Sequence, residues 1–177
     1  MDAELKPRVL YRRDEIAAAV QRLAGDIGRD YRGKCPLLIG VLKGSFMFMA
    51  DLVRQLGIPL QMDFIWISSY GRGTESSGEV RMVQCLSTEV RGQDVLIIED
   101  IVDTGLAASF LLDYLRQMGP ASLRLCALLD KPSRRQLPVT IDYLGLTVPN
   151  KFIVGYGLDW DEKFRYMPDI CTLEGVE

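Results

Sequence analysis

The sequence predicts an α/β fold, in which a mainly parallel, twisted sheet is flanked by helices. The first observation is an apolar run of branched residues, Val95–Ile98, which a turn and then a helical pattern follow. Such a short apolar run is typical of a strand buried within a parallel sheet. The second observation is that strand, glycine turn and helix occur in the same order around Gly44. Strands and helices that alternate in this way are typical of α/β proteins.

The other helices and strands are predicted from the spacing of apolar residues and from the glycine and proline residues that end them. Asp14 is placed to cap a first helix. Apolar residues follow it at a helical spacing of about 3.6 residues: Ile16, Val20, Leu23 and Ile27. Further helices are predicted over Phe46–Leu56, before Gly57, and over about Leu106–Met118. The other predicted strands are Leu37–Val41, Phe64–Ser68, Val80–Leu86, Ser122–Leu129 and Phe152–Tyr156.

The composition excludes several classes of function. The chain has 177 residues, of which 48% are hydrophobic and 25% charged, and this suits one globular domain over residues 1–177. A net charge of −3 and a pI near 5.1 argue against a general nucleic-acid binder. No apolar run approaches the roughly 20 residues of a membrane span. The polar N-terminus is no signal peptide, so we expect a cytoplasmic protein.

The chain contains no histidine, which excludes histidine-based triads and most zinc sites. Any general base must therefore be a carboxylate, lysine, tyrosine or cysteine. The four cysteines are scattered and form no Cys-x-x-Cys pair, so we expect reduced thiols in the core: Cys35, Cys85, Cys126 and Cys171.

Three carboxylates follow the central apolar run within five residues: Glu99, Asp100 and Asp103. The carboxyl end of a buried strand is the place where open α/β sheets bind ligands. Residues 104–108 would form the loop and first helical turn, where free backbone N–H groups and the helix dipole favour an anion. Acids for metal or hydroxyl groups beside an anion site suggest a phosphorylated sugar as the ligand.

Two other interpretations of these acids were weighed. A single aspartate at a strand end is usually a helix cap or a solvated loop residue, but three acids beside a core are costly without a role. Aspartic proteases also carry Asp-Thr-Gly, yet two of their aspartates share a proton and need a second copy of the motif. Here the tripeptide occurs once, at Asp103, between a strand and a helix.

Two more stretches are candidates for function. Lys43 and Gly44 follow a strand and would suit a second phosphate-binding turn, although a Lys-Gly turn is more often simply a turn. The stretch 68–78 holds three glycines and several hydroxyl groups around Tyr70, and it has little to bury. We expect a mobile loop there, and an ordinary hairpin connection is the alternative.

The run Glu99–Gly105 resembles the phosphoribosyl diphosphate signature of type I phosphoribosyltransferases, and within them the hypoxanthine-guanine branch. The match extends over most of the chain. The resemblance implies that family's fold, with a flexible lid loop over about residues 68–80 and a small C-terminal hood over about 148–177. It also implies the transfer of ribose 5-phosphate from phosphoribosyl diphosphate to hypoxanthine or guanine, with Mg²⁺ as cofactor. Homodimers or homotetramers are what the family implies.

The resemblance assigns roles to the acids and to the turn after them. Asp103 would take the proton from the purine ring nitrogen. Glu99 and Asp100 would hold the ribose hydroxyl groups, directly or through Mg²⁺, whose preferred ligands are hard oxygens. The 5′-phosphate would be held by Asp103, Thr104, Gly105, Leu106, Ala107, Ala108 and Ser109.

The same resemblance assigns the remaining site residues. The pyrophosphate would be bound by Leu42, Lys43 and Gly44, with a cis peptide bond before the lysine, and by Arg165. Asp161 and Glu162 would partly offset the charge of that arginine. The purine would be bound by Lys131, Phe152, Ile153 and Asp159, and Asp159 would also hold a second magnesium through water. The lid residues would be Ser69 and Tyr70.

One departure and two alternatives stay open. Family members commonly carry threonine where this chain has Ala107, and a charge-assisted hydrogen bond contributes about 1.5–3 kcal/mol. We therefore expect weaker binding of the phosphate. One alternative is a nucleotide-sensing regulator that keeps the fold and binds nucleic acid. The other is a transferase for adenine, uracil or orotate, against which Lys131 argues, because a donor-only group favours an oxo substituent.

Overall fold

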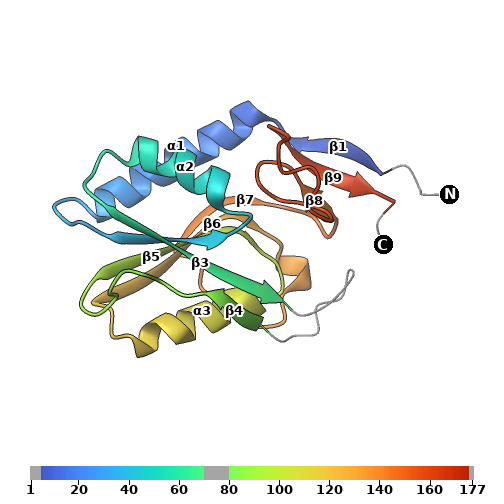
Figure 1. Cartoon of the computed structure of the whole chain (residues 1–177). Helices are drawn as coiled ribbons and strands as arrows, with labels where there is room; N and C mark the ends of the chain where they lie inside the picture. Colours follow the sequence, from blue (N-terminus) through green and yellow to red (C-terminus); the bar gives the residue numbers. More distant parts are fainter. Residues whose placement is uncertain (1–4, 70–79, 176–177) are drawn as a thin grey trace.

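The structure is a computed structural model that describes residues 5–69 and 80–175. Its centre is a six-stranded sheet in the order β4-β3-β2-β5-β6-β7 (Figure 1). All neighbouring strands are parallel except β3 and β4, which pair antiparallel. The strands are β2 (Leu37–Leu42), β3 (Gln61–Ser69), β4 (Val80–Gln84), β5 (Asp94–Val102), β6 (Ser122–Asp130) and β7 (Tyr143–Thr147).

Helices cover both faces of this sheet (Figure 1). The first face packs against α1 (Arg13–Asp30) and α2 (Phe46–Leu56), and the second packs against α3 (Leu106–Gln117). Successive residues of β5 show the alternation of a strand. Leu96 and Ile98 belong to the core under α1 and α2, whereas Ile97 belongs to the core under α3. Between Val95 and Ile98 the strand is buried on both faces and wholly apolar, so the acids that follow, Glu99 and Asp100, lie toward its carboxyl end.

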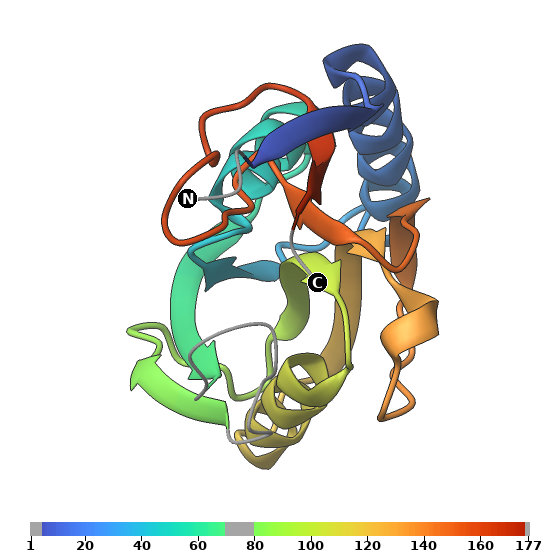
Figure 2. The ribbon, with the colours of Figure 1, turned by 90° about the vertical axis from the view of Figure 1, so that its right-hand side faces the viewer.

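A second, small sheet has the order β1-β9-β8 and is antiparallel throughout. It consists of β1 (Lys6–Tyr11), β8 (Phe152–Val154) and β9 (Ile170–Glu174). Figure 2 looks onto the carboxyl ends of the large sheet and shows the small sheet beside them. A loop over residues 155–169 joins β8 to β9, and we call it the charged loop. The short 3₁₀ helix η1 (Pro132–Arg134) follows β6.

The predicted α/β fold with a mainly parallel sheet is confirmed. Several boundaries differ. Asp14 is not the helix cap, because α1 begins at Arg13 and the Glu15 carboxylate accepts the Arg12 backbone N–H at 2.9 Å. The strand predicted to reach Tyr156 ends at Val154, since Gly155 and Tyr156 have positive φ.

Two further expectations need correction or lie outside the described chain. Cys126 and Cys171 are buried as expected, but Cys35 and Cys85 are exposed and are not core thiols. The predicted lid begins inside β3, which includes Ser69, and Tyr70 lies outside the described residues. No helix in the described part of the chain is long and apolar enough to cross a membrane.

Candidate active site

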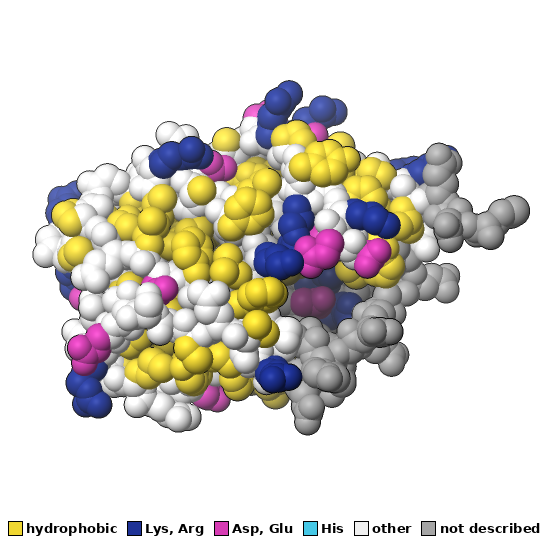
Figure 3. All heavy atoms as spheres, viewed as in Figure 1, with side chains coloured by type: hydrophobic (Ala, Val, Ile, Leu, Met, Phe, Trp, Pro, Cys, Tyr) yellow, Lys and Arg dark blue, Asp and Glu magenta, His cyan; other side chains and the backbone are white. Residues whose placement is uncertain are grey.

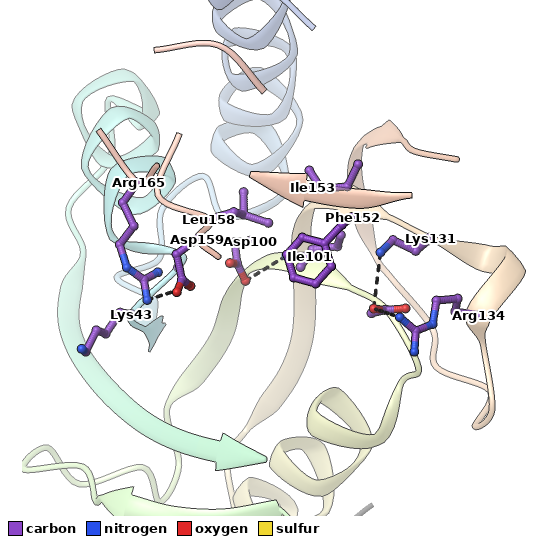
Figure 4. A pocket seen from close by; sticks show the side chains of 12 residues that line it. Lys43, Asp100, Ile101, Lys131, Arg134, Phe152, Ile153, Leu158, Asp159 and Arg165 are labelled. Carbon is purple, nitrogen blue, oxygen red and sulfur yellow. Dashed lines mark hydrogen bonds and ion pairs between the residues drawn. The ribbon is translucent and has the colours of Figure 1, made fainter. Parts of the chain in front are cut away.

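The carboxyl ends of β2, β5 and β6 meet β8 and the charged loop around a cavity of about 250 Å³. In Figure 3, acidic and basic side chains gather around a hollow in this face. Nine of the predicted site residues line the cavity: Lys43, Gly44, Asp100, Asp103, Lys131, Phe152, Ile153, Asp159 and Arg165. Figure 4 shows Lys43 and Arg165 at one end and Lys131 and Arg134 at the other.

The turn between β2 and α2 forms the first end of the cavity. The peptide bond between Leu42 and Lys43 is cis, as the resemblance implies. Gly44 approaches the Asp100 carboxylate so closely that an added Cβ would overlap one of its oxygens. The Lys43 ammonium lies 5.4 Å from the centre of the Trp66 ring, which favours a cation there. The turn therefore places the Gly44 backbone against a carboxylate of the neighbouring strand and holds the Lys43 cation beside Trp66.

Of the two acids at the end of β5, Glu99 is buried and Asp100 is half-buried, and removal from water raises the pKa of each. Asp100 lines the cavity, and burial raises its pKa to about 6, although the Ile101 backbone N–H donates to it at 2.9 Å. Glu99 does not line the cavity. Burial raises the pKa of Glu99 well above its ordinary range, and the Asp100 charge adds to this shift. Among the described residues, Glu99 Oε2 has no hydrogen-bond partner.

Asp103 lies where two cations converge. Its Oδ2 is 3.4 Å from Lys131 Nζ and 3.6 Å from an Arg134 guanidinium nitrogen. Lys131 is only 4% exposed, and burial lowers its pKa while the Asp103 charge opposes the shift. Asp103 Oδ1 is buried and has no partner among the described residues. One oxygen of this carboxylate thus pairs with two cations, and the other is enclosed without a hydrogen-bond donor among the described residues.

Arg134 was not predicted to belong to the site, although its spacing from Lys131 across the 3₁₀ helix indicates that it does. Residues three apart lie on the same side of a 3₁₀ turn. Arg134 follows Lys131 by three residues across η1, so both cations reach the same carboxylate. Arg135 fixes the backbone beside them, because its Nε donates to the Asp103 carbonyl at 3.2 Å and its guanidinium also pairs with Asp130. Ile101 and Leu158 are the other unpredicted lining residues.

The turn at the start of α3 lies next to the cavity rather than in its lining. Gly105 has φ 85°, and an added Cβ would meet the Leu137 carbonyl. The first turn of any α-helix has backbone N–H groups without intrahelical acceptors, here including those of Ala107 and Ala108. The predicted site residues that do not line the cavity are Leu42, Glu99, Thr104, Gly105, Leu106, Ala107, Ala108 and Ser109.

The charged loop closes the first end of the cavity with a network of ion pairs. Arg165 binds Asp159 at 2.8 Å and Glu162 at 3.3 Å, and it donates to the Gly157 carbonyl at 2.7 Å. The second oxygen of Glu162 accepts from Lys43 at 3.1 Å. The expectation that Glu162 offsets Arg165 is therefore confirmed. Asp161 forms its ion pair with Lys163, at 3.5 Å.

Comparison with known proteins decides the family. Residues 9–161 match the phosphoribosyl transferase domain model. The hypoxanthine-guanine phosphoribosyltransferase of Bacillus subtilis (strain 168) is 45% identical over 167 residues, which cover 94% of this chain and 93% of the relative. The chain belongs to the hypoxanthine-guanine phosphoribosyltransferase family. This confirms the resemblance, and the regulator alternative is not favoured.

Other members of the family agree in sequence and in structure. The bifunctional protein TilS/HprT of Listeria innocua is 45% identical over 94% of this chain, but the chain spans only 26% of that relative's length. The structure of a hypoxanthine phosphoribosyltransferase from Staphylococcus aureus superposes with a TM-score of 0.90 at 40% identity, covering 98% of this chain and 96% of that one. The likeness to phosphoribosyltransferase structures therefore extends over both sheets.

The carboxylates of this phosphoribosyltransferase suit a magnesium ion that keeps water and substrate ligands. Mg²⁺ is usually held by one or two carboxylates together with waters and substrate phosphates. Asp100 and Asp159 both line the cavity, and the negative charge of Asp159 contributes to the raised pKa of Asp100. Within the described residues, no group of three acidic, histidine or cysteine side chains forms a complete metal cage. The donor set thus fits an ion shared with substrate.

Proposed function

We propose that this chain transfers ribose 5-phosphate from phosphoribosyl diphosphate to hypoxanthine or guanine, forming IMP or GMP and pyrophosphate. The observation that carries the proposal is the polarity of the cavity. One end holds the Asp103 carboxylate beside the buried Lys131, and the other end holds Lys43 and Arg165. A planar base with an oxo group and a ring N–H suits the end with Asp103 and Lys131, and a highly charged leaving group suits the end with Lys43 and Arg165 (Figure 4).

At the purine end, each side chain has a chemical task. Lys131 donates a hydrogen bond to the exocyclic oxygen of the base, and as a donor-only group it disfavours an amino substituent. Asp103 accepts the proton of the ring nitrogen that attacks the sugar. Phe152 stacks on the base from β8, with its own ring held edge-on by Trp160 at 4.7 Å between ring centres. Ile153 and Asp159 border the second carbon of the purine.

At the sugar and diphosphate end, the protein groups are matched to the charges of the substrate. Glu99 and Asp100 hold the ribose hydroxyl groups and stabilise positive charge on the sugar carbon. The turn over residues 104–109 holds the 5′-phosphate through backbone N–H and hydroxyl groups. Leu42, Lys43, Gly44 and Arg165 bind the pyrophosphate that leaves.

Glu99, Asp100 and Asp159 would hold magnesium. When bound, the ion would supply positive charge that stabilises the pyrophosphate leaving group. The protein's own part is to place these carboxylates: Gly44 leaves room for Asp100, and Arg165 fixes Asp159 at 2.8 Å. We also propose that the small sheet and the charged loop form the hood over the base, within a single domain of residues 1–177.

A product assay tests this function. The protein is incubated with magnesium and phosphoribosyl diphosphate, and hypoxanthine, guanine, xanthine, adenine and uracil are offered in turn. We expect nucleotide from 6-oxopurines only. Nucleotide from adenine or uracil would overturn the base assignment. Absence of product, together with RNA or DNA retained in a filter-binding assay, would instead favour the regulator.

Matched lysine variants sharpen the test of base recognition. Lys131→Met removes the buried donor, and we expect it to abolish the preference for hypoxanthine over adenine. Lys151→Met removes a lysine that is exposed on the loop before β8, so it should leave this preference unchanged. Equal effects of the two variants would contradict the role of Lys131.

A further inference from the structure

A single carboxylate bridges the two cations at the first end of the cavity. Glu162 Oε1 lies 3.1 Å from Lys43 Nζ, and Glu162 Oε2 lies 3.3 Å from an Arg165 guanidinium nitrogen. Each oxygen thus has its own cation, which is the way in which a phosphate group would also use them. Lys43 comes from the β2–α2 turn and Arg165 from the charged loop, so Glu162 joins two separate segments of the chain.

The backbone of the charged loop aims Glu162 at these cations. The Glu162 N–H donates to Asp159 Oδ2 at 2.8 Å, and Trp160 and Lys163 exchange backbone hydrogen bonds of 3.1 and 2.9 Å. Glu162 itself has φ 60°, a conformation that non-glycine residues rarely adopt. A strained backbone that places one charged side chain against two cations indicates a role for that side chain.

The side chains of Arg165 and Glu162 differ in how freely they can move. The Arg165 side chain is 20% exposed and is held by Asp159 and the Gly157 carbonyl as well as by Glu162. The Glu162 side chain is 65% exposed. Glu162 is therefore the member of the network that can swing into solvent while the arginine stays in place. Hydrogen bonding from Lys43, more than any other contact, lowers the pKa of Glu162, which keeps it charged at neutral pH.

We propose that Glu162 is an internal competitor of pyrophosphate. It occupies Lys43 and Arg165 in the ligand-free protein, yields them to the diphosphate of the substrate, and takes them back as pyrophosphate leaves. The proposal rests on the pyrophosphate site assigned above. A diphosphate carries more charge than one carboxylate, so it displaces Glu162, but part of its binding free energy is spent in breaking the two ion pairs. Glu162 thereby weakens pyrophosphate binding and speeds its release, a step that limits turnover in many enzymes.

Two isosteric variants of neighbouring acids test the competition. Glu162→Gln removes the charge that bridges the cations. Asp161→Asn removes the same charge one residue earlier, at a similar φ of 50°, from a side chain that pairs with Lys163 instead. Binding of magnesium pyrophosphate to the whole chain is measured by calorimetry, and KM is measured for phosphoribosyl diphosphate and for hypoxanthine.

We expect Glu162→Gln to tighten pyrophosphate binding about three- to tenfold and to lower KM for phosphoribosyl diphosphate by a similar factor. KM for hypoxanthine should not change, and Asp161→Asn should shift each value by less than about twofold. A merely structural role of Glu162 would weaken pyrophosphate binding when the carboxylate is removed. That result, an unchanged affinity, or equal effects of the two variants would each overturn the proposal.

A lysine variant separates the failure of the competition from the failure of the site. Lys43→Met should weaken pyrophosphate binding, and in its background Glu162→Gln should have a smaller effect than in the original chain. If Lys43→Met leaves pyrophosphate binding unchanged, the assigned pyrophosphate site is wrong. The proposed competition by Glu162 is then wrong as well. If Lys43→Met weakens binding but Glu162→Gln does nothing, the competition alone is wrong.

Discussion

Two regions present acids to the same cavity in opposite ways. The carboxylate wall, which we define as Glu99, Asp100 and Asp103, lies at the end of β5; Asp100 and Asp103 line the cavity, and Glu99 is buried next to Asp100 outside the lining. Two of its oxygens have no partner in the described chain, and burial raises the pKa of both Glu99 and Asp100. The charged loop carries Asp159 and Glu162, and each of these acids is paired with a cation.

The difference shows what each region is suited to do. A buried acid without a hydrogen-bond partner lowers the stability of the folded protein. A cation, a hydroxyl group or a proton that pairs with this acid raises the stability again. A paired acid on an exposed loop contributes little to folding and can exchange its partner at small cost. The acids of the wall are therefore suited to pair with a bound ligand. The acids of the loop already have cationic partners, and ligand binding would change those partners. Five substitutions test this contrast, in order of decreasing expected effect.

The largest effect is expected for Asp103→Asn, which removes the proton acceptor but keeps the shape of the wall. General base catalysis contributes about 10²- to 10⁴-fold, so kcat should fall by that factor. The Kd for phosphoribosyl diphosphate, measured by calorimetry, should stay within a few-fold. Unchanged turnover would remove Asp103 as the base.

Next is Gly44→Ala, which places a Cβ against the Asp100 carboxylate and so disturbs the wall from the neighbouring turn. Overpacking of this kind costs about 1–3 kcal/mol of unfolding free energy, which urea denaturation measures. The matched control is Gly25→Ala in α1, where an added Cβ meets nothing within 4 Å. That helical substitution should stabilise the protein by about 0.5–1 kcal/mol. Equal effects would contradict the close approach at Gly44.

Ala107→Thr restores a hydroxyl group at the start of α3, beside the wall. We expect it to strengthen IMP binding by about 1.5 kcal/mol, or roughly tenfold in Kd. Binding of hypoxanthine alone should not change, because the base carries no phosphate. An unchanged Kd for IMP would show that backbone donors already satisfy the 5′-phosphate.

Glu99→Gln tests the cost of the buried charge in the wall. Because the folded pKa of Glu99 lies above its ordinary value of 4.5, ionisation at rising pH favours the unfolded chain. The glutamine variant should therefore be more stable at pH 8, by about 1 kcal/mol in urea unfolding, and the advantage should vanish as the pH falls to about 4.5. A constant difference across this range would indicate that the charge is not the cause.

The smallest effect is expected on the charged loop. Lys163→Gln breaks the exposed pair with Asp161 and should change the unfolding free energy by less than about 0.5 kcal/mol. Differential scanning calorimetry at low and at high salt should give the same small shift. A loss above 1 kcal/mol would mean that the loop, like the wall, depends on individual charges for its fold.

The sequence was most informative where local chemistry decides the structure. The bounds of α2 were predicted to the residue, because Gly57 adopts the left-handed conformation that ends a helix. The acids at the end of β5 were found because they directly follow the apolar run Val95–Ile98, which is buried on both faces of the sheet. Five of the nine predicted lining residues meet because the carboxyl ends of the parallel strands β2, β5 and β6 lie at one edge of the sheet. The other four come from β8 and the charged loop, and the resemblance alone placed them in the site.

Sequence reasoning failed where distant segments decide the structure. β1 was not predicted, because it is largely exposed and owes its conformation to pairing with β9. The ion pair between Glu162 and Lys43 depends on two turns that only the fold brings together. Arg134 was missed because η1 was not foreseen, although its spacing from Lys131 would have revealed it.

The small sheet also sets the order in which the molecule can be completed on the ribosome. β8, which carries Phe152 and Ile153, pairs only with β9 in that sheet, and β9 pairs on its other side with β1, the first strand of the described chain. A nascent chain can form the large sheet, with its acids, before β9 has been synthesised and can pair with β1. The pairing of β8 in the small sheet therefore cannot form until β9 has been synthesised, and proteolytic clipping before Ile170 would leave β8 without its strand partner.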